Sequence, residues 1–149
     1  MRFLAVWILL CLLVGVPFAS RPLTELTPVE ILCLQKQGQD VLARCDGGVA
    51  ARGSTVQQAV GNLHRAAPGR LELGTVDFAV LTGVSPAELG QLGLRPAVGV
   101  FAAPAVEDPE ALAVYLRTHG ESVTLGMLEE DPSLPLPRLV PGETGLVLE

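Results

Sequence analysis

The stretch from Ser54 to Gly83 constrains the fold of this chain most strongly, because it predicts a helix followed by a buried strand. Ser54 can accept hydrogen bonds from the N–H groups of a first helical turn, so we expect it to be the N-cap. The helix ends at Ala67-Pro68-Gly69, because proline disfavours the α conformation in the residue before it. Apolar residues at helical spacing form one stripe: Val56, Ala59, Val60, Leu63 and Ala67.

The strand after this turn is apolar on both faces. Leu71 and Leu73 alternate with polar residues, and the segment from Val76 to Leu81 is then almost continuously apolar. Strands of this kind usually lie in the centre of a sheet, with helices over both faces. The stretch therefore predicts a scaffold, and it contains no set of residues for catalysis.

Further strands are predicted on either side of this unit. Residues 29–34 and 41–45 are rich in β-branched and aliphatic side chains and are separated by polar turn residues, which indicates a β-hairpin. Small residues at 49–53 then lead into the helix. Residues 97–103 form a second apolar strand, which we expect to lie parallel to the central strand because a helix joins the two.

Two further helices have clear start signals. Ser85-Pro86-Ala87-Glu88 combines an N-cap, an early proline and a capping box, and Gly90 and Gly93 keep this helix short. Asp108-Pro109-Glu110 opens another helix, which ends at His119-Gly120. Its predicted apolar face consists of Ala111, Leu112, Tyr115 and Leu116.

Together these elements predict an α/β (α+β) fold: a mixed sheet of four or five strands with an N-terminal β-hairpin and two or three packed helices. We place this single domain at residues 21–128, with a strand or edge segment at 123–128. Prolines interrupt residues 129–149, so we expect an extended acidic surface tail there. A short strand at 145–148 closes it.

The first twenty residues predict export. Arg2 precedes an uncharged apolar run from Phe3 to Phe18, which is typical of a signal peptide or an N-terminal membrane anchor. The residues around Ser20 are compatible with both cleavage and retention. The expected location is extracytoplasmic, either membrane-anchored or secreted, with the membrane as a partner through this segment. Lipidation of Cys11 is not expected, because Leu10 precedes it and apolar residues follow it.

The charge of the exported part argues against nucleic acid as a partner. Residues 21–149 contain 9 basic and 16 acidic side chains, a net charge of −7. Such a domain repels phosphate backbones and anionic lipid headgroups. Only 17% of the chain is charged and 4% aromatic, which leaves few residues for a polar active site.

Cys33 and Cys45 lie on the two predicted hairpin strands. In an oxidising exterior they can form a disulfide that closes a loop of about a dozen residues, worth roughly 3 kcal/mol. The alternative is that both remain thiols and pack as small hydrophobic residues. The register of the hairpin decides between the two, and the sequence does not determine it.

No constellation of residues predicts catalysis, a metal site or a cofactor. His64 and His119 have no serine in a G-x-S-x-G turn to act on, and the serines at 54 and 85 are better explained as helix caps. No metal-ligand spacing such as C-x-x-C or H-E-x-x-H occurs. The acids Glu129-Glu130-Asp131 are typical of a solvated turn, and Gly47-Gly48 lacks the lysine of a phosphate-binding loop.

The central pattern S-T-V-x-x-A-V-x-N-L, followed by R-L-x-L-G-T-V-D-F-A-V-L-T-G, resembles the N-terminal domain of the spore germination Ger(x)C family. Residues 21–32 are similar to the opening of that family after its leader, and residues 95–116 to its next strand and helix. The chain departs from the family in having no lipoprotein cysteine near Ser20-Arg21 and no counterpart of the larger C-terminal region. The matching positions are Gly53, Thr55, Ala59, Leu63, Leu71, Leu73, Gly74, Val76, Val80, Leu81 and Gly83.

The resemblance implies an exported, membrane-associated interaction protein, similar to the N-terminal domain of a germinant receptor C subunit. It would act in spore germination or sporulation with receptor or other envelope proteins, and the family supplies no catalytic residues. Two alternatives stay open. One is a secreted domain that binds a small ligand, and the other is a minor hydrolase that uses His64 or His119.

Overall fold

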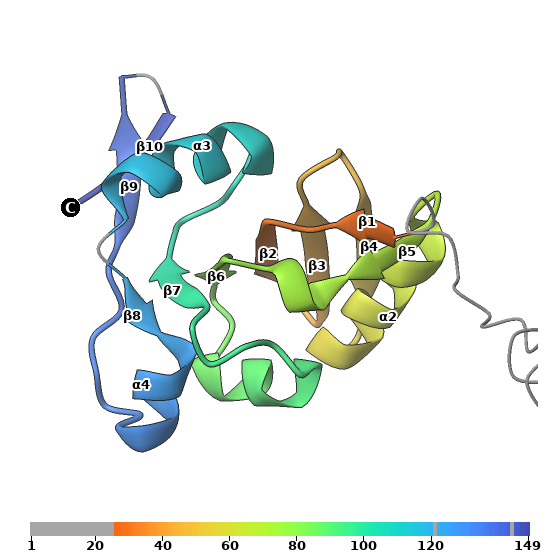
Figure 1. The fold of residues 1–149 in the computed structure, drawn as a ribbon, viewed down its shortest axis with the longest axis horizontal. Helices are drawn as coiled ribbons and strands as arrows, with labels where there is room; N and C mark the ends of the chain where they lie inside the picture. Colours follow the sequence, from red (N-terminus) through yellow and green to blue (C-terminus); the bar gives the residue numbers. More distant parts are fainter. Residues whose placement is uncertain (1–25, 121, 144) are drawn as a thin grey trace, which may run out of the picture.

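The computed structural model describes residues 26–120, 122–143 and 145–149 of the 149-residue chain. The predictions for the leader at 1–20, for Cys11 and for residues 21–25 lie outside this part. The described chain is a mixed α+β domain built around a six-stranded sheet (Figure 1). The predicted fold class is confirmed, and the sheet has six strands instead of the four or five expected.

The six strands lie in the order β4-β3-β2-β6-β7-β8. In the centre, β2 pairs with β6 and β6 with β7 in parallel, whereas β3, β4 and β8 are antiparallel to their neighbours. The predicted hairpin is β2–β3 and the predicted central strand is β6, so both predictions are confirmed. The bounds are β2 Ile31–Gln37, β3 Asp40–Cys45, β4 Ala50–Gly53, β6 Phe78–Thr82, β7 Gly99–Ala102 and β8 Val123–Thr124.

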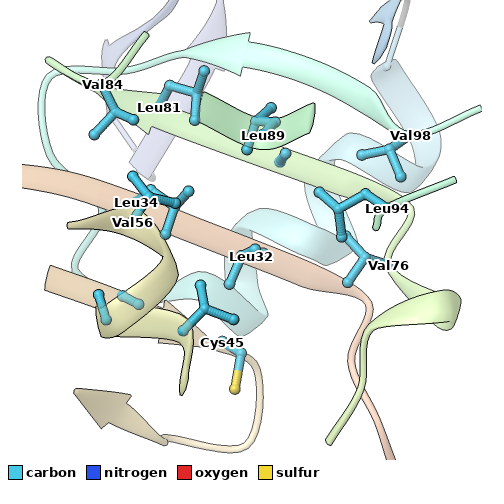
Figure 2. Packing of buried hydrophobic residues seen from close by; sticks show 14 of the residues in the cluster. Leu32, Leu34, Cys45, Val56, Val76, Leu81, Val84, Leu89, Leu94 and Val98 are labelled. Carbon is cyan, nitrogen blue, oxygen red and sulfur yellow. The ribbon is translucent and has the colours of Figure 1, made fainter. Parts of the chain in front are cut away.

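One face of the sheet is covered by α2 (Val56–Ala66), the 3-10 helix η3 (Pro86–Leu92) and α4 (Leu125–Glu130). Four residues of the predicted stripe on α2 are buried there, and Ala67 packs against the same core. Figure 2 shows Val56 of α2 close to Leu34 and the side chains of Leu81 and Leu89 in the same cluster. Helix α2 lies mainly against β3 and β4, and it shares this core with β6.

The other face is covered by α3 (Pro109–His119) and by a hairpin of β9 (Leu139–Gly142) and β10 (Gly145–Leu148), as Figure 1 shows. Its core combines Phe101 with aliphatic residues, among them Val80 and Leu139. Tyr115 Oη accepts a hydrogen bond of 3.1 Å from Leu148 N–H, which joins α3 to β10. On α3 the buried residues are Leu112, Ala113 and Leu116, and the predicted core residue Ala111 is exposed.

A separate pair of short parallel strands, β1 (Leu26–Pro28) and β5 (Arg70–Glu72), precedes the central strand along the chain. The 3-10 helix η2 (Leu73–Thr75) follows β5 and separates it from β6. Thr75 Oγ1 accepts a hydrogen bond of 2.9 Å from Val29 N–H, which holds η2 against the chain entering β2. The apolar residues at 71–81 therefore belong to two strands rather than one.

The start of α2 differs from the prediction by one residue. Thr55 is the N-cap, since its Oγ1 accepts a hydrogen bond of 3.1 Å from Gln58 N–H. The Ser54 hydroxyl instead donates to Oε1 of Gln58 at 2.6 Å. The helix ends at Ala67 as predicted, and the caps predicted for η3 and α3, Ser85 and Asp108, are confirmed.

Strand β4 was missed because Ala50-Ala51-Arg52-Gly53 lacks the β-branched side chains by which strands are recognised. Its small residues have a packing role. A Cβ atom at Gly53 would lie 2.4 Å from the backbone nitrogen of Ala59. Only glycine allows α2 to approach the strand this closely.

The C-terminal part of the chain packs on the domain more closely than the predicted extended surface tail. The segment predicted as a strand at 123–128 is β8 for two residues and then α4, with Thr124 as the N-cap. Leu134 and Leu136 pack against the core under α2, and Leu139 is 2% exposed in the core under α3. The leucines between the prolines hold this segment on the domain, and the predicted last strand is confirmed as β10.

Candidate functional site

The two cysteines of the hairpin face opposite sides of the sheet. Cys33 lies opposite Arg44 in the register and Cys45 opposite Leu32, so the two side chains point to different faces. Both thiols are free and buried, Cys33 in the core under α3 and Cys45 in the core under α2. The disulfide alternative is therefore wrong for this register, and the two residues pack as small hydrophobic side chains.

Burial also makes these thiols chemically inert. It raises the pKa of Cys33 to about 12 and the pKa of Cys45 to about 11. The thiolate is the nucleophile and the metal ligand, and neither cysteine forms it at neutral pH. The arrangement excludes both residues as reactive groups of the folded domain.

The two histidines are not brought together, because α2 and α3 lie on opposite faces of the sheet. His119 stacks on Tyr115 with ring centroids 4.5 Å apart. Its Nδ1 lies 2.7 Å from Thr118 Oγ1 and 3.1 Å from the Tyr115 carbonyl oxygen. These contacts complete the exposed end of α3, and they involve a threonine where the hydrolase alternative needs a serine and an acid. His64 lies half-buried on α2.

The acidic turn and the glycine pair have structural roles. Asp131 accepts hydrogen bonds from Ser133 N–H and the Ser133 hydroxyl at 3.0 and 2.6 Å, which hold the pKa of Asp131 below its usual value. Gly47 and Gly48 both have positive φ and form the β3–β4 turn. Over residues 26–120, 122–143 and 145–149, no group of three or more His, Cys, Asp or Glu side chains is placed to hold a metal ion.

The carboxyl ends of β6 and β7 form one candidate ligand site. The chain leaves β6 toward η3 on one face and β7 toward α3 on the other, and open α/β sheets bind ligands where connections diverge in this way. Gln35 and Thr82 are direct neighbours in the register here, so their side chains lie on one face of the sheet, whereas Lys36 follows on the other face. The amide of Gln35 and the hydroxyl of Thr82 can bind a polar ligand, but they do not form a nucleophile–base pair.

A second candidate site, at the β4 end of the sheet, was not predicted. Asn62 Nδ2 on α2 donates to the carbonyl oxygen of Arg52 at 2.6 Å, and Asn62 Oδ1 accepts from Arg65 Nη2. Arg52 and Arg65 are exposed. We call β4 together with Asn62 and Arg65 the basic edge.

The sequence contains a signal for this site that the charge of the whole chain conceals. The segment from Lys36 to Arg70 carries five basic and two acidic side chains, a net charge of +3, within a chain of net charge −6. This segment forms β3, β4 and α2. Counting charge by segment rather than over the whole domain would have located it.

The opposite end of the sheet is closed. Strand β8 has two residues, and the chain then turns directly into α4. Leu125 N–H donates to the Val98 carbonyl oxygen and Gly126 N–H to the Pro96 carbonyl oxygen, each at 2.8 Å. These bonds continue the register of β7 and β8 to the carbonyl groups that precede β7, so the sheet ends here where α4 begins.

Comparison of the chain with protein-family models, with curated proteins and with solved structures gives no significant match. Among the described residues, none of the helices has the length and apolar character needed to cross a membrane.

Proposed function

We propose that this chain is an exported, membrane-associated interaction domain without enzymatic activity, and that it is related to the N-terminal domain of a germinant receptor C subunit. The observation that carries the proposal is the basic edge. It offers a partner the outward backbone groups of β4, which no second strand of the described residues pairs, and the charges of Arg52 and Arg65.

The proposed lack of enzymatic activity is supported by how the reactive side chains are used. The thiols of Cys33 and Cys45 are buried and protonated at neutral pH. The hydroxyls of Thr55, Ser85 and Thr124 accept hydrogen bonds at helix starts. A catalytic group has to be available to substrate, and these groups are occupied by the fold.

The membrane association is supported by the sequence alone, through the uncharged run from Phe3 to Phe18. The germination role is supported by the residues between Gly53 and Gly83 that resemble the Ger(x)C family. In this proposal the N-terminal segment directs the chain to the membrane, and the domain meets receptor or other envelope proteins outside the cytoplasm.

The test is to express the full chain with a C-terminal tag in its own cells and to isolate membranes from sporulating and vegetative cultures. We expect the tagged chain in the membranes of sporulating cells, and chemical cross-linking should capture an envelope protein. Mass measurement of its N-terminus reports cleavage. The variant Leu10→Arg interrupts the apolar run and is the control that should fail to reach the membrane. Expression confined to vegetative cells would contradict the germination role.

The alternative of a secreted small-ligand-binding domain is favoured by one observation, the adjacent polar pair Gln35 and Thr82. An amide-resolved NMR titration with a library of small polar compounds tests it. A ligand at this site would shift the amide signals of Gln35 and Thr82 and leave those of Ala50 and Arg52 unchanged. Gln35→Ala would remove the effect.

A further inference from the structure

Strand β4 has one side paired and one side open. Cys45 N–H donates to the Val49 carbonyl oxygen at 3.1 Å where β3 turns into β4, which aligns the backbone groups of Val49 with β3. In an antiparallel ladder every second residue faces the same neighbour, so Ala51 and Gly53 also face β3. The N–H and C=O groups of Ala50 and Arg52 therefore point away from the sheet.

The hydrogen bond from Asn62 confirms this direction, because it reaches the Arg52 carbonyl oxygen from α2 rather than from β3. Within the described chain, β4 pairs with β3 alone. Another strand can therefore pair with the outward N–H groups of Ala50 and Arg52 and with the carbonyl oxygen of Ala50. The carbonyl oxygen of Arg52 is already occupied by Asn62.

Two exposed arginines, Arg52 and Arg65, lie around this side of β4. Arg65 is linked to the edge through Asn62, and Arg52 belongs to it. The carboxylate of Asp46, in the turn between β3 and β4, accepts hydrogen bonds from the N–H groups of Glu30 and Ile31 at 3.0 and 3.3 Å. The other acid of this segment, Asp40, lies on the same face of the sheet as Arg52 and diagonally across from it, since Arg52 pairs with Leu42.

We propose that β4 binds an extended acidic segment of a partner protein, which adds to the sheet as a further strand. The inference specifies the partner of the interaction domain proposed above and rests on that proposal. Backbone groups of Ala50 and Arg52 pair with the added strand. The side chain of Arg52 lies on the face of the sheet away from α2 and that of Arg65 on the α2 face, so each receives carboxylates from a different face of the strand.

A second copy of this chain fits the same edge poorly. Two β4 strands paired with each other would place Arg52 near its own equivalent and add the charge of both Arg65 side chains. Like charges on facing strands destabilise the pairing. An acidic segment reverses the sign of this interaction.

In this proposal Asn62 blocks part of the edge against an added strand. Its amide occupies the Arg52 carbonyl oxygen, which an incoming strand would otherwise use. Natural sheets commonly protect their edges from unwanted pairing by such means. An added strand has to displace this side chain, so removal of the amide should strengthen binding.

The experiment uses the full chain in mild detergent and an acetylated octapeptide of Glu-Glu-Val-Val repeats, which carries carboxylates on both faces of an extended chain. A Lys-Lys-Val-Val octapeptide is the charge control. Fluorescence anisotropy gives the affinity, and amide NMR locates the peptide. We expect the acidic peptide to shift the Ala50 and Arg52 signals. The double variant R52E/R65E should bind roughly tenfold more weakly, as two reversed surface charges imply. Asn62→Ala should bind more tightly than wild type.

Strand addition is separated from simple charge attraction by two substitutions at one residue. Ala50→Pro removes an outward N–H group and leaves the ladder with β3 intact, because prolines are tolerated on edge strands. It should weaken binding, and Ala50→Val should not. Wild-type binding by Ala50→Pro, equal binding of the Lys-Lys-Val-Val peptide, or no binding of the acidic peptide would each overturn the inference.

The two proposals fail in different ways. If cross-linking in cells captures an envelope protein through a surface other than β4, the interaction domain stands and the strand addition is wrong. If the acidic peptide binds as expected but the chain is found in the cytoplasm of vegetative cells, the basic edge stands and the proposed location and role are wrong.

Discussion

The two edges of the sheet differ in how the backbone groups of their strands are paired. At the β8 end, a strand of two residues turns into α4, and hydrogen bonds from Leu125 and Gly126 use the adjacent carbonyl groups. At the β4 end, Ala50 and Arg52 leave outward backbone groups, and among the described residues only the Arg52 carbonyl oxygen is occupied by a side chain. The β8 end is closed by the fold itself, and the β4 end is closed by a side chain that can move.

The two ends also differ in the charge of the neighbouring residues. Acidic residues 129–131 follow the closed end, whereas the open end belongs to a segment of net charge +3. The two ends of the sheet therefore differ both in their free backbone groups and in the charge of the chain around them.

The largest expected effect tests what supports the open end. Leu63 on α2 is fully buried against β3 and β4, so Leu63→Ala should lower the free energy of unfolding by about 3 kcal/mol. Urea denaturation measures the loss, and amide exchange should accelerate in β4. Val114→Ala, at a position 55% exposed, is the control and should change stability by less than about 0.5 kcal/mol. A loss below about 1 kcal/mol for Leu63→Ala would show that α2 does not hold this end.

A pair of glycines tests the close approach of α2 to β4. Gly53→Ala would place a Cβ atom 2.4 Å from the Ala59 nitrogen, and we expect a loss of about 2 kcal/mol. Gly61→Ala in the same helix has nothing within 4 Å and should stabilise the protein by about 0.5–1 kcal/mol. Thermal unfolding of the two variants gives the comparison. Equal effects of the two substitutions would be incompatible with this packing.

The pH dependence of stability tests the burial of Cys33. Its pKa is raised from 9.0 to about 12 in the folded state, so the stabilisation is complete below pH 9 and is lost as the pH rises toward 12. The unfolded chain releases the proton first, which lowers the free energy of unfolding by at most about 1.4 kcal/mol per pH unit. Urea denaturation from pH 8 to 10 should show a shallower slope for Cys33→Ala than for wild type. Identical slopes would mean that the thiol is solvated.

A smaller effect separates the two candidate caps of α2. Thr55→Ala removes the acceptor for Gln58 N–H and should lower the free energy of unfolding by about 1 kcal/mol. Ser54→Ala removes only a hydrogen bond between exposed side chains and should cost less than about 0.5 kcal/mol. Chemical denaturation of both variants measures the difference. The reverse order would restore Ser54 as the N-cap.

Much of the fold could be predicted because the local signals and the packing agree. The central strand, the hairpin and the starts of η3 and α3 follow from apolar runs and from caps at Ser85 and Asp108. Strand β4 could not be predicted, because its small residues allow contact with α2 but have low strand propensity. The C-terminal hairpin was seen only in part, because buried leucines such as Leu139 are hidden among prolines.

The candidate sites were harder to predict for a different reason. Whether Cys33 and Cys45 can pair depends on a register that shifts by one residue without changing the pattern. The basic edge depends on Asn62 and Arg65 reaching a strand that was not expected. The pairing of the cysteines and the basic edge both depend on contacts between elements that are distant in the sequence, so the pattern of one segment does not predict them.

Amide hydrogen exchange by NMR tests the contrast between the two ends most directly. At the β4 end, we expect Ala50 and Arg52 to exchange rapidly while Ala51 and Gly53 are protected by β3. At the β8 end, Leu125 and Gly126 should be protected by their bonds to Val98 and Pro96. Slow exchange at Ala50 and Arg52, or rapid exchange at Leu125 and Gly126, would contradict an open end and a closed end in one sheet.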